Sequence, residues 1–177
     1  MRLKNSDANM ESNTQFDALE YFKLLAEHNR LAREHEFRPC FCSGPDGIND
    51  IIQEFRTTAN FIMIDDTTSQ NTYSRGVGFF DRNAYTVFIL AAYKFDDMTD
   101  RENKLKLCRR IFRQFHSRMI RDKESYAYGD SLEYLQVHQI YSKELPRYSM
   151  NGVTGLYFMV NNEEPVDLTY NPKEWYE

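Results

Sequence analysis

One segment, residues 100–124, constrains the fold more than any other because its apolar residues recur with the period of a helix. Spacings of three and four residues separate Leu105, Cys108, Phe112, Phe115 and Met119. At about 100° per residue these positions share one side of an α-helix. Thr99 and Glu102 have the spacing of a capping box at its start. The pattern predicts a long amphipathic helix that packs on the core, with Phe112 and Phe115 both nearly buried.

Several other segments have the length and composition of β-strands. They are Phe61–Ile64, Tyr73–Phe80 and Tyr85–Phe95 before the long helix, and Leu132–Ser142 and Gly152–Val160 after it. Short runs rich in β-branched and aromatic residues, bounded by turn residues, are typical of strands. Asp81–Asn83 has the composition of a hairpin turn. The segments before the helix are therefore expected to pair antiparallel, with this turn leading into Tyr85–Phe95.

The sequence near the N-terminus predicts a helix. Thr14 opens the pattern, with Asp17 three residues later, and the following apolar residues have helical spacing: Phe16, Leu19, Phe22, Leu25 and Ala26. We expect this helix over residues 14–36, because Pro39 disfavours helix just beyond that point. Asp46 is expected to cap a second, short helix with Ile48 and Phe55 on its apolar face.

Helices and strands follow one another in blocks rather than in strict alternation. We therefore expect an α+β fold, with a mostly antiparallel sheet of four to five strands, the long helix on one face and an N-terminal helix. No internal repeat or linker divides the chain. The expected organisation is a flexible arm over residues 1–13, a single domain over 14–168 and an extended C-terminal tail over 169–177.

Composition excludes several classes of protein. The chain has 177 residues, of which 41% are hydrophobic and 15% aromatic, and this content excludes global disorder. No apolar run approaches the roughly 20 residues that span a bilayer, so no membrane partner is expected. Cysteines 40 and 42 are too close for a usual disulfide framework, which favours a reducing cytoplasm. The net charge of −5 makes nucleic acid an unlikely partner for the whole surface.

Two kinds of chemical site are alternatives, a zinc site and a hydrolytic site. His28, His35, Cys40 and Cys42 are residue types that zinc accepts, but one residue between the cysteines is shorter than in the usual motifs. A hydrolase or nuclease would need Asp65 or Asp66 near His116, His138 or another acid. No nucleophile motif or phosphate loop accompanies these residues. We therefore expect no catalytic residue, no metal and no cofactor.

Charge is distributed unevenly along the chain. Residues 101–124 contain nine Lys or Arg and three acids, whereas residues 125–177 contain three Lys or Arg and eight acids. The side of the long helix opposite the apolar face carries Lys106, Arg109, Arg110, Arg113 and Arg121. A solvated helix face would explain this pattern, and so would a surface that binds the acidic part of a second copy. Contact with nucleic acid is less favoured, because Phe112 and Phe115 point inward and offer no ring for base stacking.

The predicted order of elements resembles a family of small phage and prophage proteins of the tail or neck, the tail-terminator-like group. Four segments carry the resemblance: residues 16–22, residues 61–66, residues 85–95 and residues 148–158. The likeness covers roughly residues 14–168. It rests on the order of the predicted elements and on the general character of their sequences.

The resemblance implies a non-enzymatic component of the virion. Copies would form a ring, typically a hexamer, that terminates the tail tube or joins tail to head, after assembly in the host cytoplasm. Its partners would be further copies of this chain and neighbouring tail or neck proteins. Because one basic helix and an acidic C-terminal part coexist in the chain, a head-to-tail contact could close such a ring. The alternative is a small cytoplasmic interaction or regulatory protein of a mobile element.

Overall fold

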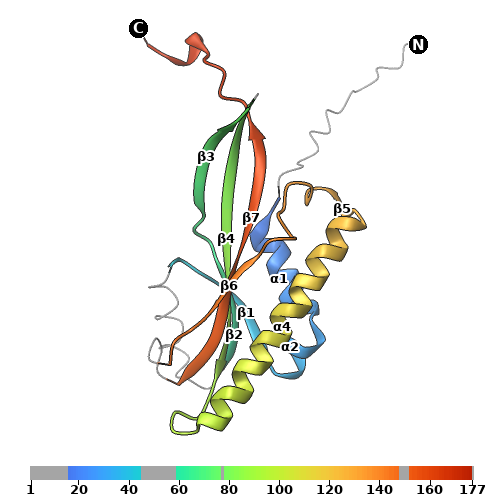
Figure 1. The fold of residues 1–177 in the computed structure, drawn as a ribbon, viewed down its shortest axis with the longest axis vertical. Helices are drawn as coiled ribbons and strands as arrows, with labels where there is room; N and C mark the ends of the chain where they lie inside the picture. The colour runs from blue at the N-terminus through green and yellow to red at the C-terminus, as the bar shows by residue number, and fades with distance from the viewer. Residues whose placement is uncertain (1–15, 45–58, 77, 148–151, 177) are drawn as a thin grey trace, which may run out of the picture.

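The computed structural model describes residues 16–44, 59–76, 78–147 and 152–176, and it confirms the α+β class (Figure 1). The α-helices of the described residues lie on one side of a long sheet, and the longest of them runs along it. In chain order the elements are α1 (Ala18–His28), α2 (Arg30–Glu34), β1 (Phe37–Cys42), β2 (Asn60–Asp65), β3 (Ser69–Arg75), β4 (Gly78–Ala92), α4 (Met98–Glu124), β5 (Ala127–Asp130), β6 (Tyr141–Glu144), β7 (Val153–Val166) and the 3₁₀ helix η1 (Pro172–Glu174).

The sheet is mixed and, within the described residues, has six strands in place of the expected four to five. Its order is β1-β2-β4-β7-β6, and β3 pairs with β4 beyond the end of β2. All pairs are antiparallel except β1 with β2. The additional strand is β1, which sequence patterns did not predict because it contains Pro39. A strand with only one neighbour tolerates proline, since the missing N–H is not needed for an outer partner.

The N-terminal helix differs from its expected bounds. Thr14 lies outside the described residues, and Asp17 caps α1 by accepting a hydrogen bond from the Glu20 N–H at 3.0 Å. Asn29 then interrupts the predicted 14–36 helix, because its side chain accepts from the Ala32 N–H at 2.8 Å and caps α2. The short helix predicted around Ile48 and Phe55 lies outside the described residues, as does the N-terminal arm.

The long helix begins earlier than predicted. Asp97 is its N-cap and accepts from the Asp100 N–H at 2.9 Å, so Thr99 lies inside the first turn and the proposed capping box is wrong. An aspartate two residues earlier is the cap and satisfies an exposed N–H group of a first turn that begins two residues earlier.

The turn between β3 and β4 also lies elsewhere. Gly76, with φ of 68°, ends β3, and β4 runs unbroken from Gly78. Asp81–Asn83, predicted as a turn, is paired on both sides, with β3 and with β7. After α4 only Tyr141 and Ser142 of the predicted Leu132–Ser142 strand lie in a strand, β6, which continues to Glu144. The last strand, β7, continues past Val160 to Val166.

The main core lies between the helices and one face of the sheet. Every second residue of a strand points into it, among them Ile62, Ile64, Val87 and Ile89. The residues between them point to the other face of the sheet, where they form a smaller apolar cluster. Phe115 of α4 is 1% exposed, as predicted. Phe112 is only partly buried, contrary to prediction, because it sits at the border of the helix where its ring meets Phe158 at 5.0 Å between centroids.

Beyond the helices, three strands continue as a projection that we call the β-arm. It consists of β3, residues 78–84 of β4 and residues 161–166 of β7, and Figure 1 shows it extending past the end of α4. One side-chain cluster crosses all three strands. Arg82 pairs with Glu163 at 2.6 Å and lies 5.0 Å from the centroid of the Tyr73 ring, and the Tyr73 hydroxyl donates to Glu163 at 3.1 Å. In the arm, these polar and aromatic side-chain contacts add to the backbone pairing of the three strands.

Pairing of β4 with β7 requires glycine at position 155. A Cβ atom there would lie 2.0 Å from the Ile89 carbonyl oxygen of β4, far inside van der Waals contact. We expect Gly155→Ala to lower the free energy of unfolding by more than about 3 kcal/mol, above most single substitutions. Gly78→Ala is the control, because a Cβ there meets nothing within 4 Å, and its effect should stay below about 1 kcal/mol. Urea unfolding measures both; equal stability of the two variants would contradict this register.

The two phenylalanines of α4 also differ in how deeply their side chains are buried. Phe115→Ala should cost about 3 to 5 kcal/mol, because it removes a fully buried ring and leaves a cavity. Phe112→Ala should cost clearly less, since solvent already reaches that ring. Chemical denaturation followed by circular dichroism gives both values. A larger loss for Phe112→Ala would show that the helix is rotated relative to the sheet.

Candidate assembly surface

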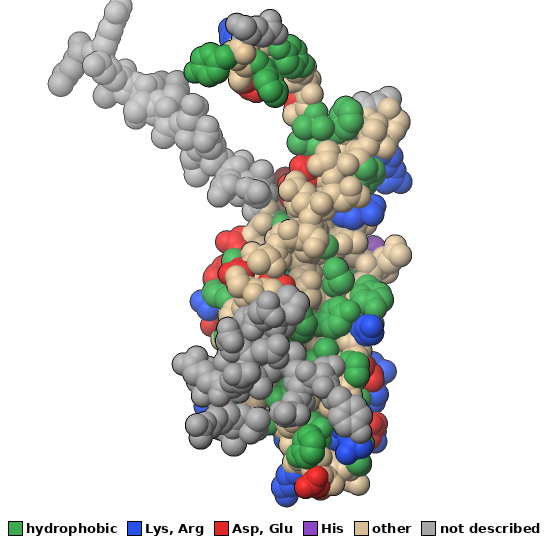
Figure 2. All heavy atoms as spheres, turned by 90° about the vertical axis from the view of Figure 1, so that its left-hand side faces the viewer, with side chains coloured by type: hydrophobic (Ala, Val, Ile, Leu, Met, Phe, Trp, Pro, Cys, Tyr) green, Lys and Arg blue, Asp and Glu red, His purple; other side chains and the backbone are tan. Residues whose placement is uncertain are grey.

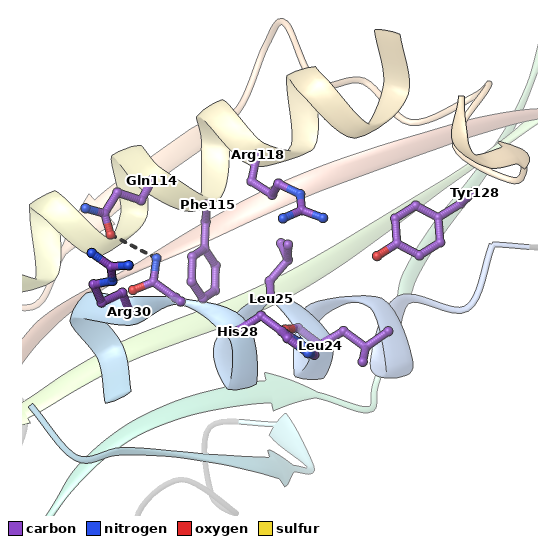
Figure 3. Close-up of a pocket in the computed structure, with 9 residues that line it drawn as sticks. Leu24, Leu25, His28, Arg30, Gln114, Phe115, Arg118 and Tyr128 are labelled. Atoms are coloured by element: carbon purple, nitrogen blue, oxygen red, sulfur yellow. Dashed lines mark hydrogen bonds between the residues drawn. The ribbon is translucent and has the colours of Figure 1, made fainter. Parts of the chain in front are cut away.

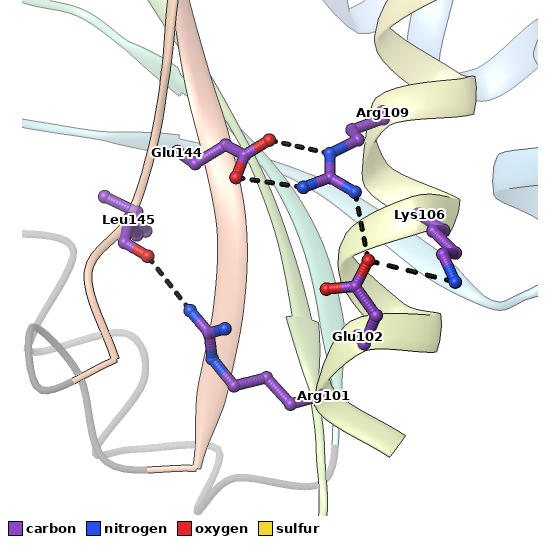
Figure 4. A network of polar contacts seen from close by, with 6 residues as sticks. All are labelled: Arg101, Glu102, Lys106, Arg109, Glu144 and Leu145. Carbon is purple, nitrogen blue, oxygen red and sulfur yellow. Dashed lines mark hydrogen bonds and ion pairs between the residues drawn. The ribbon is translucent and has the colours of Figure 1, made fainter. Parts of the chain in front are cut away.

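The predicted cationic face of α4 divides into two groups of side chains. Arg109 is the clearest member of the first group, because it faces β6 and bonds acids of its own chain (Figure 4). Its Nε and Nη2 donate to the two carboxylate oxygens of Glu144 at 2.6 and 3.1 Å, and Nη1 reaches Glu102 at 3.3 Å. The bidentate geometry is the strong form of this interaction. Arg109 therefore helps to hold α4 against β6.

Lys106 belongs partly to the same network. Its Nζ lies 3.8 Å from Glu102, one helical turn away, and its side chain is 62% exposed. Nearby, Arg101 donates to the Leu145 carbonyl oxygen at 3.3 Å. The prediction that Arg109 points directly away from the core is thus wrong. Arg109 is only about 100° from the buried Cys108 around the helix, so it lies at the border of the apolar face.

Arg110, Arg113 and Arg121 form the second group. All are exposed, and within the described part of the chain no acid lies within ion-pair distance of them. They fall within about 80° of one another around the helix axis. This outer surface of α4, defined by these three arginines, is available to an acidic partner.

A buried polar cluster that sequence patterns did not predict joins α1 to α4. Asp122 is 2% exposed, accepts from the Tyr21 hydroxyl at 3.2 Å and pairs with Arg118 Nε at 2.6 Å. Burial raises the pKa of Tyr21, and the Asp122 charge raises it further, so the phenol stays protonated as a donor. The spacing of four residues between Arg118 and Asp122 is the signal that could have revealed this pair.

Next to this cluster lies an open pocket between α1, α2 and α4 (Figure 3). Its volume is about 320 Å³. Arg30, Arg118 and His28 contribute cationic or titratable groups, and Leu25 and Phe115 contribute apolar walls. Across one end Asn29 donates to the Gln114 side chain at 2.9 Å, which ties α2 to α4. The pocket combines positive charge with apolar surface.

The cysteines do not gather with the histidines. Cys40 and Cys42 lie on β1, where burial raises their pKa to about 11 and about 12, so both are protonated thiols at neutral pH. His28 instead donates to the Leu24 carbonyl oxygen at 2.8 Å in its own helix. Among the residues that the structure describes, no three His, Cys, Asp or Glu side chains form a group suited to a metal.

The acids considered for hydrolysis organise a loop. Asp65 accepts from the Gly44 N–H at 3.0 Å and from both the N–H and hydroxyl of Thr67, and Asp66 accepts from Ser43. His116 donates to the Val137 carbonyl oxygen at 2.7 Å. The described residues that line the pocket beside Asp65 and Asp66 include no histidine but do include another acid, Asp17. The Asp17 carboxylate caps α1 by accepting from the Glu20 N–H. The carboxylates are thus engaged in local hydrogen bonds.

Comparison with protein-family models gives no matching family, and a search of curated proteins gives no match. Within the described ranges, no helix has both the length and the apolar character needed to cross a membrane.

The Arg109–Glu144 pair makes stability depend on pH. The hydrogen bond from Arg109 holds the pKa of Glu144 below its usual value. Its stabilisation is therefore fully present above the unfolded-state pKa, about 4.3, and is lost as pH falls through the lower folded-state value. Glu144→Gln should cost up to about 1 kcal/mol at pH 7, because both side chains are partly exposed.

That cost should shrink in acid, as urea unfolding at pH 7 and pH 3 would measure. Glu27→Gln serves as the control, since Glu27 is exposed on α1. An equal cost of Glu144→Gln at both pH values would mean that the ion pair does not stabilise the fold.

Proposed function

We propose that this chain is a non-enzymatic structural component of a phage or prophage tail or neck, whose copies associate in a ring that terminates the tail tube or joins tail to head. Its place would be the virion, after assembly in the host cytoplasm. The order of elements supports the proposal: an N-terminal helix, a hairpin, a long helix across the sheet and a closing pair of strands, β6 and β7. This is the order on which the resemblance to tail-terminator-like proteins rests.

The β-arm is the observation that carries the proposal. Its three strands extend past the helical layer, and Phe79 on it is 46% exposed. The outer edge of β3 pairs with no strand among the described residues. Isolated proteins usually protect such edges, because unpaired N–H and C=O groups invite pairing with another chain. A strand group that projects beyond the helices and has this unpaired edge among the described residues suits a protein that contacts neighbours in an assembly.

Electrostatics supports self-association in particular. The outer surface of α4 presents Arg110, Arg113 and Arg121, while the β7 strand and the residues after it carry Glu164 and Asp167 in a chain with a net charge of −5. Opposite charges on different parts of identical molecules favour a head-to-tail contact. Such a contact closes into a ring when its rotation permits. Exposed ion pairs orient copies, and apolar contacts must supply most of the affinity.

The chemical groups of the described residues favour binding over catalysis. The carboxylates of Asp65 and Asp66 accept hydrogen bonds from their own loop, and the thiols of β1 have raised pKa values. An activated nucleophile would instead need an adjacent base or a lowered pKa. A regulatory protein of a mobile element would share these features, but it would be a monomer or dimer bound to a different soluble partner.

Charge reversal on α4 tests the proposal. Arg110→Glu, Arg113→Glu and Arg121→Glu together should leave the circular dichroism spectrum unchanged, because all three side chains are exposed. The triple variant should associate at least about tenfold more weakly in sedimentation velocity experiments. Arg33→Glu with Lys94→Glu and Lys143→Glu gives the same change in net charge at other exposed positions.

The control variant should assemble like the parent protein. Equal weakening of both variants would assign the effect to net charge and not to the α4 surface. A parent protein that stays monomeric at all concentrations would overturn the proposed ring.

A further inference from the structure

The last described residues carry an unusual density of exposed aromatic surface. Residues 167–176, which we call the aromatic tail, include four large apolar side chains, each more than half exposed: Leu168, Tyr170, Trp175 and Tyr176. Figure 1 shows this segment leaving the tip of the β-arm, and Figure 2 shows apolar side chains gathered in the lobe at its end. Clustered exposed apolar side chains mark interaction sites.

The tail has a local shape of its own. Asn171 caps the 3₁₀ helix Pro172–Glu174, accepting from the Lys173 N–H at 3.2 Å and donating to Glu174 at 2.9 Å. The rings of Tyr170 and Trp175 stack with centroids 6.2 Å apart. A segment that is ordered before binding loses less conformational entropy on docking. The order of this tail, together with its exposure, points to a binding element.

The pocket between α1, α2 and α4 has the complementary chemistry. Arg30 and Arg118 offer guanidinium groups, and Leu25 and Phe115 offer apolar walls (Figure 3). Its volume of about 320 Å³ lies at the lower end of the range of small-ligand sites. An aromatic ring beside a carboxylate fits such a site, because guanidinium groups pair with carboxylates and stack on aromatic faces. In the tail, Glu174 and Trp175 are neighbours.

The tail lies away from the pocket of its own chain. None of its described residues lines that pocket, which lies between α1, α2 and α4. The tail instead leaves the tip of the β-arm (Figure 1). We propose that the aromatic tail of one copy docks, through Glu174 and Trp175, into the pocket between α1, α2 and α4 of the next copy. This inference rests on the proposed function and names the contact that joins the copies. Because donor and acceptor surfaces differ, the contact is heterologous and can close a ring.

Intrinsic fluorescence reports this docking directly, because Trp175 is the only tryptophan of the chain. At low concentration its indole is 64% exposed and should emit at long wavelength. As concentration rises, the emission should shift to shorter wavelength in parallel with the sedimenting mass. An assembled particle whose emission remains that of an exposed indole would overturn the docking while leaving ring assembly intact.

Charge exchange identifies the pocket. Arg30→Glu should weaken association at least about tenfold, as should Glu174→Arg, and the two substitutions combined should restore it. Arg33→Glu, at an exposed position of the same helix outside the pocket, is the matched control and should have no effect. If Arg33→Glu weakens association as much as Arg30→Glu does, or if the combined variant is not restored, the pocket is not the docking site.

Truncation of the aromatic side chains separates the two proposals. Trp175→Ala with Tyr170→Ala should abolish assembly, whereas Phe95→Ala, which removes a 48% exposed ring elsewhere, should not. If the parent protein, the double variant and Phe95→Ala all assemble, tail docking is refuted and the proposed function still holds. If the parent protein itself does not assemble, the proposed function fails, and tail docking between copies fails with it.

Discussion

Pairing between β4 and β7 is the interaction on which the rest of the structure depends. The two strands run antiparallel from Phe79 opposite Val166 to Ala92 opposite Val153, and each also carries another strand on its outer edge. At one end their side chains enter the core beneath the helices. At the other end the same strands continue into the β-arm, where Arg82 and Glu163 stand opposite each other. One ladder therefore supports both the stable part of the domain and the part that projects from it.

The long helix uses its charged residues for two separate tasks. At the border of the apolar face, Arg109 bonds Glu144 and ties α4 to β6. Arg118 bonds Asp122 in the same helix, and Asp122 also accepts from Tyr21 of α1. Arginines on the outer surface, such as Arg110 and Arg113, bond no acid within the described residues. Intramolecular pairing thus concentrates the remaining positive charge on one side of the helix. This division makes a charge-directed contact with another molecule possible without loss of the fold.

Long periodic segments were predictable from sequence, whereas local competition between signals was not. The period of α4 spans many turns, so its existence and its buried side were clear, although Phe112 at the border was not. Asp81–Asn83 has turn composition, but pairing with strands on both sides overrides that local preference. Similarly, the edge strand β1 was not predicted because it contains Pro39, and proline is rare inside strands. The basic character of the candidate surface followed from composition, but the partners of Arg109 and the buried Asp122 depend on contacts between distant segments.

The molecule has several surfaces suited to neighbours. They are the exposed aromatic residues of the tail, the outer edge of β3 in the β-arm and the three exposed arginines on the outer surface of α4. Electron microscopy of the purified protein, with two-dimensional class averages and the native mass of the same sample, tests this most directly. Closed rings of one size, with a mass that is a fixed multiple of the 21.1 kDa chain, are expected. A monodisperse 21.1 kDa particle at every concentration would contradict an assembly role.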